Sequence, residues 1–262
     1  MTGTQRIKLR HLVPSIVTVF AICAGLTSVR MSLEGHLEAS LYFILLAVFL
    51  DAADGKLARF LDTASPFGAE LDSLADFFNF GIAPGILLYN TLYIGTQHAS
   101  IGWLATLVLA VCCALRLARF NLSIHRADVT LKKDGFFVGV PAPALACLAL
   151  MPVFLYLNGW QNSDFPVARA IYVICVGLLA VSTIPSYSIK HASIKRAHLP
   201  FVVVGAVVLV VCLVVYPWFT LILANLIYLG SLPFSYLSFK KVDQKSDRPA
   251  RTFVTSHDEN GG

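Results

Sequence analysis

Four aspartates in the first third of the chain have a spacing that suits the binding of a cation. Asp51 and Asp54 are three residues apart, and Asp72 and Asp76 are four apart, so each pair shares one face of a helix. Apolar runs precede and follow the stretch from 51 to 76. Acidic groups at the ends of membrane helices are costly unless they bind something positive. The pattern therefore predicts a cation site built from two adjacent helix ends.

The residues between these aspartates indicate which chemistry such a site would perform. Hard divalent cations such as Mg²⁺ take oxygen ligands and leave positions open for water or phosphate oxygens. Two such ions roughly 4 Å apart can stabilise both the attacking and the leaving oxygen of a phosphoryl displacement. Gly55, Ala58 and Gly68 would let a bulky group lie against the helix backbone, and Arg59 adds a charge suited to phosphate. Together these residues predict a metal-dependent site for a phosphate-bearing substrate.

The composition of the chain excludes a water-soluble domain. Of its 262 residues, 57% are hydrophobic and only 13% are charged, whereas soluble domains are ~25% charged. We expect an all-α polytopic membrane bundle of about eight transmembrane helices, each needing roughly 20 largely apolar residues. The expected helices cover approximately residues 13–29, 37–50, 68–93, 101–120, 138–157, 167–184, 199–216 and 217–239.

The distribution of basic residues indicates how these helices are oriented. If the N-terminus lies inside, the inside segments carry all of the 20 Lys and Arg except Arg30 and Arg169. Because cytoplasmic loops are enriched in Lys and Arg, we expect both termini and the acidic stretch to be cytoplasmic. We expect a cytoplasmic segment at 1–12, the membrane domain at 13–240 and a disordered cytoplasmic tail at 241–262. The modest net charge of +5 indicates contact with anionic membrane lipids rather than with nucleic acid.

The aspartates belong to a longer pattern. From Asp51 to Asp76 the chain reads D-x₂-D-G-x₂-A-R-x₈-G-x₃-D-x₃-D, which resembles, at all eight specified positions, the signature of the CDP-alcohol phosphatidyltransferase family. The resemblance implies a six-helix core, extended here by two C-terminal helices. It also implies the metal-assisted transfer of a phosphatidyl group from CDP-diacylglycerol to an alcohol, with release of CMP.

The resemblance further implies a role for each matched position. The metal ligands would be Asp51, Asp54, Asp72 and Asp76, with Asp76 also the candidate general base. The CDP-lipid would bind at Gly55, Ala58, Arg59 and Gly68, with Arg59 near the nucleotide or orienting the acids. The implied cofactor is a divalent metal, Mg²⁺ or Mn²⁺, as two ions, and the implied assembly is a homodimer. The alternative is a buried ion-pair network or a set of helix caps around Arg59.

Three further stretches resemble the branch of the family whose acceptor is serine: residues 65–85, 115–121 and 139–144. We therefore expect L-serine to be the acceptor. Independently, a serine carboxylate would be bound well by a guanidinium, which forms two parallel hydrogen bonds. Arg116 and Arg119 lie on one face near the end of the fourth helix and are candidates for the acceptor or the diphosphate, with Asn121 beside them. The alternative for both arginines is anchoring at the membrane interface.

Two other functions are open at this stage. In the first, the enzyme uses another acceptor alcohol. A phosphorylated acceptor (glycerol phosphate or inositol phosphate) would need more than two arginines in its binding site, and choline would need an aromatic cage. The second is a divalent-cation transporter, which predicts acids near the bilayer midplane and in both halves of the chain. Here the acids lie at one edge, and the second half has no matching cluster. In either enzyme case we expect an integral protein of the bacterial inner (cell) membrane.

Overall fold

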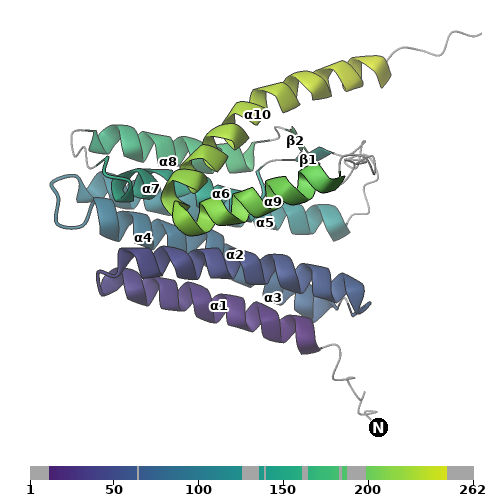
Figure 1. Cartoon of the computed structure of the whole chain (residues 1–262), viewed down its shortest axis with the longest axis horizontal. Coiled ribbons are helices and arrows are strands. Elements are labelled where there is room, and N and C mark those ends of the chain that lie inside the picture. Colours follow the sequence, from purple (N-terminus) through teal and green to yellow (C-terminus); the bar gives the residue numbers. More distant parts are fainter. Residues whose placement is uncertain are drawn as a thin grey trace, which may run out of the picture.

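The computed structural model describes residues 12–63, 65–125, 136–138, 140–160, 165–182, 185–187 and 199–246. In this part of the chain, long apolar helices run back and forth in one bundle, accompanied by a short antiparallel pair of strands (Figure 1). In chain order the elements are α1 (Leu12–Leu33), α2 (Leu37–Phe60), α3 (Pro66–Asp76), η2 (Phe77–Ile82), α4 (Ala83–Leu92), α5 (Ala99–His125), β1 (Phe136–Val138), α6 (Ala142–Ala149), α7 (Met151–Leu157), α8 (Pro166–Val181), β2 (Pro185–Tyr187), α9 (Leu199–Val215) and α10 (Pro217–Ser246).

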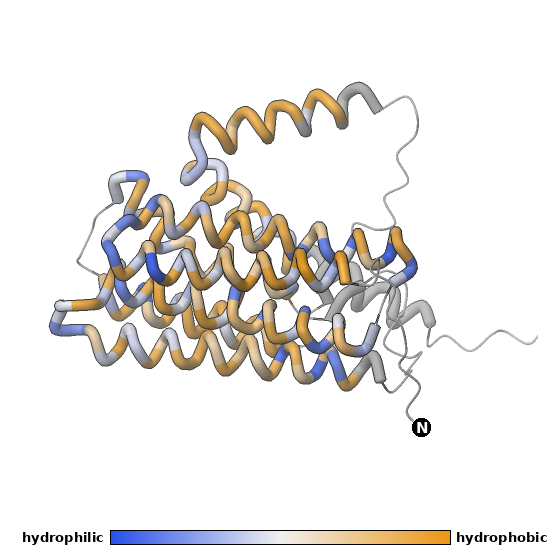
Figure 2. The backbone as a smooth tube through the Cα atoms, turned by 90° about the horizontal axis from the view of Figure 1, so that it is seen from below, coloured by the Kyte–Doolittle hydropathy of each residue, from blue (hydrophilic) through white to orange (hydrophobic). Residues whose placement is uncertain are grey.

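The hydropathy of the bundle is that of a membrane protein. Hydrophobic residues fill the middle of the helices, and hydrophilic residues gather toward the two ends (Figure 2). Among the described residues, three helical stretches are long and apolar enough to cross a membrane, and three shorter apolar helices accompany them. The long stretches are Leu12–Leu33, Pro66–Leu92 and Ala99–Leu122. These features confirm the predicted all-α polytopic membrane bundle.

The turn between α2 and α3 brings the acidic ends of two helices together. Asp62 takes a left-handed backbone conformation with φ 51°, which non-glycine residues adopt mainly in tight turns. Ser65 then caps α3, because its Oγ accepts a hydrogen bond from the Gly68 amide at 3.0 Å. Pro66 follows at the first helical position, where its missing N–H costs nothing. The chain thus reverses direction within a few residues.

The third predicted helix contains a π-helical turn that the sequence analysis did not anticipate. The segment from Pro66 to Leu92 is continuous, but η2 interrupts it directly after Asp76. Asn79 and Phe80 of this turn are buried in the bundle. Two residues beyond η2, Pro84 has no N–H to donate, so regular α-helical hydrogen bonding cannot run through this region unbroken. Short π-helical turns inside α-helices frequently occur at functional sites.

The fifth predicted helix is divided in two. Expected over residues 138–157, it begins at Ala142 and breaks at Leu150 between α6 and α7. The cause is Pro152, which cannot donate a hydrogen bond to the carbonyl of Leu148. The hydroxyl of Tyr172 on α8 donates to that carbonyl instead, at 2.9 Å. The break is therefore compensated by a neighbouring helix.

The last two helices follow the expected division at Pro217: α9 ends at Val215, and α10 begins at Pro217. α9 stands apart from the rest of the bundle (Figure 2) and presents a row of exposed apolar side chains, among them Val207, Val208, Leu209, Val210 and Val211. α10 continues to Ser246, past the expected start of the disordered tail at 241. Good helix formers such as Lys and Gln in this stretch favour that extension. Of the expected cytoplasmic segment at 1–12, residues 1–11 lie outside the described part of the chain, and so do residues 247–262 of the expected tail.

Packing between α5 and the end of α4 generates a test of the fold. A methyl group on Gly102 would overlap the ring of Tyr93, whose hydroxyl donates to the Pro166 carbonyl at 2.9 Å. We expect Gly102→Ala to destabilise the protein by about 1–3 kcal/mol, measured as a lower Tm in detergent. The matched control is Gly205→Ala in α9, where nothing lies within 4 Å and alanine should leave Tm unchanged or raise it. Equal Tm values for the two variants would contradict this packing.

Candidate active site

Three of the four predicted aspartates meet at one point. One carboxylate oxygen from each of Asp51, Asp72 and Asp76 lies within 4.8 Å of the others. Asp51 comes from the last turns of α2, while Asp72 and Asp76 come from one face of α3. All three side chains are half-buried, so water screens their mutual repulsion only in part. A cluster of this kind suits a hard divalent cation, which takes carboxylate oxygens as ligands.

The fourth aspartate, Asp54, lies beside this triplet and is held differently. Its side chain is only 3% exposed, and its Oδ2 accepts a hydrogen bond from the Thr18 hydroxyl at 2.6 Å. The other oxygen, Oδ1, is buried and has no hydrogen-bond partner among the described residues, and the same is true of Asp76 Oδ1. Leaving a buried acceptor unsatisfied costs about 1–3 kcal/mol. These two oxygens therefore fit a site that is completed by a cation.

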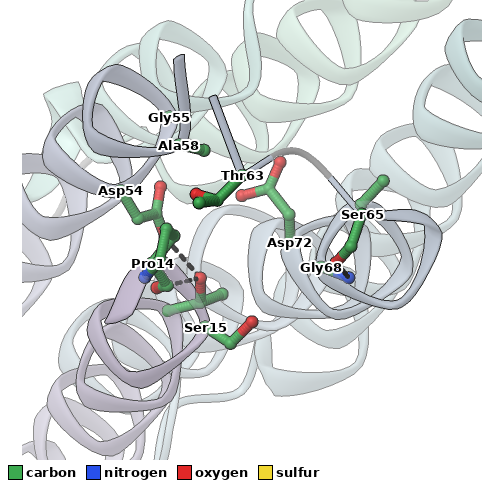
Figure 3. A pocket seen from close by; sticks show the side chains of 11 residues that line it. Pro14, Ser15, Asp54, Gly55, Ala58, Thr63, Ser65, Gly68 and Asp72 are labelled. Atoms are coloured by element: carbon green, nitrogen blue, oxygen red, sulfur yellow. Dashed lines mark hydrogen bonds between the residues drawn. The ribbon is translucent and has the colours of Figure 1, made fainter. Parts of the chain in front are cut away.

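A cavity of about 160 Å³ opens between α1, α2 and α3 beside the aspartates (Figure 3). Asp54 and Asp72 flank it from opposite sides, with Thr63 between them. The three predicted small positions all contribute to its wall. The lining residues are Pro14, Ser15, Thr18, Asp54, Gly55, Ala58, Thr63, Ser65, Gly68, Ala69 and Asp72.

The small residues keep this cavity open in two ways. At Gly55, nothing lies within 4 Å of the place that a Cβ would take, so a side chain there would occupy free space next to Asp54. At Gly68, a Cβ would come within 3.1 Å of the Ser65 hydroxyl that caps α3, so a larger residue would disturb the cap. A flat or bulky ligand can thus approach the backbone of both helices.

Helix α1 also contributes to the site, which was not expected from the sequence. Pro14, Ser15 and Thr18 line the cavity, and Thr18 holds Asp54. The available signal was two hydroxyl side chains three residues apart, on one face of an otherwise apolar helix. Thr63 was missed as well, although it lies inside the acidic stretch, is 3% exposed and has a hydroxyl without a partner in the described part of the chain.

Arg59 lies on the surface of α2, outside the wall of the cavity. Its side chain is exposed and donates from Nε to the Gly55 carbonyl of its own helix at 2.8 Å. It is absent from the lining of the cavity. Within the described ranges Arg59 forms no ion pair with an aspartate. These ranges therefore contain no buried ion-pair network around Arg59, which was the alternative interpretation.

Arg116 of α5 is the arginine that reaches the carboxylates. Its guanidinium interacts electrostatically with Asp76 and Asp51, although no direct ion pair joins it to either side chain. One of its nitrogens, Nη1, is buried without a hydrogen-bond partner among the residues that the structure describes. A buried guanidinium nitrogen of this kind can receive an anionic group of a ligand.

The other two candidates on α5 are engaged within the protein. Arg119 donates from Nη1 to the Val181 carbonyl at 2.6 Å and from Nη2 to the Ser182 carbonyl at 3.2 Å. These bonds satisfy carbonyl groups at the end of α8 that have no partner inside the helix. Asn121 donates from Nδ2 to the Ser73 hydroxyl at 3.0 Å and so joins α5 to α3. The contacts of both residues favour a structural role.

Comparison with known proteins places the chain in a family. Its residues 11–181 match the family described as CDP-alcohol phosphatidyltransferase, and residues 199–233 match CDP-alcohol phosphatidyltransferase 2. The chain therefore belongs to the CDP-alcohol phosphatidyltransferase family, as the eight-position pattern predicted.

Particular relatives in this family carry a more specific name. The chain is 36% identical over 228 residues to the CDP-diacylglycerol–serine O-phosphatidyltransferase of Mycobacterium leprae. The aligned region covers 86% of this chain and 74% of the relative. It is 33% identical over 239 residues to the protein of that name from Mycobacterium tuberculosis (90% and 82% covered). It is 34% identical over 214 residues to the one from Methanocaldococcus jannaschii (81% and 88% covered).

The carboxylate cluster generates a metal-removal test. We expect Mg²⁺ or Mn²⁺ to raise the Tm of the purified protein, by an amount equivalent to about 2.7 kcal/mol at a hundred times the dissociation constant. Asp72→Asn should abolish most of this increase and should raise the Tm measured in EDTA, because one of the repelling charges is gone. The control is Glu70→Gln, an exposed position of α3 outside the cluster. If the metal raised the Tm of Asp72→Asn as much as that of the wild type, the cluster would not be the metal site.

Proposed function

We propose that this protein transfers the phosphatidyl group of CDP-diacylglycerol to the hydroxyl of L-serine, which yields phosphatidylserine and CMP. The observation that carries the proposal is the meeting of Asp51, Asp72 and Asp76 beside a cavity walled by small residues. The choice of serine rests on the relatives described above, which are named for that acceptor.

The four aspartates would hold the divalent metal. When bound, Mg²⁺ or Mn²⁺ would supply positive charge that neutralises the diphosphate and stabilises the departing CMP. Asp51 and Asp76 belong only to the triplet, Asp54 only to the cavity, and Asp72 to both. This division supports our proposal of two ions, with Asp72 contributing to the binding of each.

The nucleotide and the acceptor would approach the aspartates from different helices. Gly55, Ala58 and Gly68 leave room for the cytidine against α2 and α3, while the exposed Arg59 would bind the nucleotide only from the rim of the site. Arg116, on α5, would bind the serine carboxylate through Nη1, which has no hydrogen-bond partner among the described residues. The acyl chains would remain in the bilayer beside the apolar helices.

Asp76 would act as the general base. Its Oδ1 is buried and has no partner in the described residues, so it is available to accept the proton of the serine hydroxyl. The serine oxygen then forms a bond to the phosphorus of the phosphatidyl group, and the phosphoanhydride bond breaks as CMP leaves. The helix framework holds the reacting groups in place, and positioning of this kind can supply a large share of the rate enhancement.

The location and assembly of the enzyme are part of the same proposal. The placement of Lys and Arg supports cytoplasmic termini and a cytoplasmic site in a bacterial inner membrane. That placement suits the substrates, because serine is water-soluble and CMP must be released into water. The proposal of a homodimer rests on the family resemblance.

The proposed reaction is tested by measuring CMP release from CDP-diacylglycerol with a panel of alcohols. We expect purified protein with Mg²⁺ or Mn²⁺ to release CMP when L-serine is added. Release with glycerol phosphate, inositol phosphate or choline, but not with serine, would reject the acceptor and keep the reaction class. Asp76→Asn should lower turnover by a factor of about 10²–10⁴ or more without lowering the Tm in EDTA. Asp62→Asn is the control, since Asp62 is exposed and asparagine tolerates its left-handed conformation.

The two arginines of α5 should respond differently to substitution. Arg116→Lys removes the planar pair of donors that suits a carboxylate, so we expect the KM for serine to rise about tenfold with little change in Tm. Arg119→Lys replaces the two guanidinium nitrogens that donate to the end of α8 by one ammonium group, so we expect a lower Tm and a nearly unchanged KM. Steady-state kinetics and thermal unfolding of both variants provide the measurement. A raised KM in Arg119→Lys alone would reverse the assignment.

A further inference from the structure

A second cavity, of about 410 Å³, lies between α7 and α8. It is at the other end of the bundle from the aspartates, because it surrounds the start of α8, whereas Arg119 holds the end of α8 on the acidic side. In Figure 1 this is the left end of the molecule, where α7 finishes and α8 begins. Most of its wall is apolar, contributed by Met151, Pro152, Leu155, Phe165 and Ala168.

Among the described residues that line this cavity, Arg169 is the one that carries a charge. Its side chain is half-buried, and among the described residues its guanidinium has no hydrogen bond and no ion pair. The hydroxyls nearby carry no charge that could neutralise the guanidinium: Tyr93 donates to the Pro166 carbonyl at 2.9 Å, and Tyr172 donates to the Leu148 carbonyl at 2.9 Å. A partly buried cation without a partner is costly, so this position favours an anionic ligand.

The rest of the cavity indicates what kind of anion fits. A free phosphate ion would use the guanidinium but gain nothing from the apolar walls. A phospholipid uses both, because its phosphate can take two hydrogen bonds from arginine while an acyl chain covers the apolar groove. Trp160, 71% exposed at the rim, is of the type that gathers where membrane and water meet.

We propose that the cavity between α7 and α8 binds one anionic phospholipid, from the leaflet at the end of the bundle opposite the aspartate cluster. Basic groups between membrane helices bind lipid headgroups in this manner. The site is separate from the carboxylates and does not depend on the proposed transfer reaction.

The proposal is tested by native mass spectrometry of the full chain in detergent. With phosphatidylglycerol we expect one retained lipid per chain, and Arg169→Gln should weaken this binding about tenfold, as loss of a hydrogen bond to a charged group does. The matched control is Arg30→Gln. The charge count places Arg30 on the same side of the membrane, but it is exposed and already paired with Glu34 at 2.8 Å, so phosphatidylglycerol binding should not change.

Further arms separate the lipid from other occupants. Ala168→Trp fills the groove but keeps Arg169, and we expect it to abolish retention of phosphatidylglycerol while the elution volume and CMP release stay unchanged. Equal retention of phosphatidylglycerol by the wild type and Arg169→Gln would overturn the site. Equal retention of phosphatidylcholine would overturn its preference for anionic lipid, and full displacement by inorganic phosphate would overturn the lipid assignment. Asp164 lies outside the described residues. If phosphatidylglycerol were retained by Asp164→Asn but not by the wild type, Asp164 would be the internal partner of Arg169, and the proposal would be overturned.

Discussion

Repulsion among Asp51, Asp72 and Asp76 is the constraint on which the acidic end of the bundle depends. Two like charges about 4 Å apart repel by roughly 4 kcal/mol at an effective dielectric constant of 20, and three carboxylate oxygens lie within 4.8 Å of one another here. In the absence of a ligand, a hydrogen bond between the side chains of Asp51 and Asp76 relieves part of this repulsion, and the fold must oppose the rest. The same repulsion gives the site its affinity for a divalent cation, because binding relieves it.

Several contacts around the cluster resist this repulsion. The Ser65 cap and Pro66 fix the start of α3, and Thr18 holds Asp54 from α1. Asn121 joins α5 to α3 through Ser73. These contacts lie at the start of α3, between α1 and α2, and between α5 and α3, so the carboxylates cannot move apart without breaking hydrogen bonds in several places. Such a preorganised site is what electrostatic catalysis requires.

The sequence predicted the apolar helices and the acidic cluster well because both depend on local patterns. Long apolar runs leave few alternatives to membrane helices, and the i,i+4 spacing of Asp72 and Asp76 places them on one face of any helix. Features that depend on contacts between distant residues escaped prediction. The break before Pro152 is stabilised by Tyr172 from another helix, and the roles of Arg116 and Arg119 differ because only Arg119 reaches the end of α8.

The π-helical turn after Asp76 changes which face of the helix points toward the core of the bundle. One extra residue in a turn rotates everything that follows by about 100° relative to a regular α-helix. The residues before η2 can therefore direct their carboxylates toward α2, while Ala83, Leu87 and Leu88 after it face the core of the bundle. The demands of chemistry and of packing are thereby separated along a single helix. Removing one residue from η2 would force the two halves to share one face, and either the acids or the core would turn the wrong way.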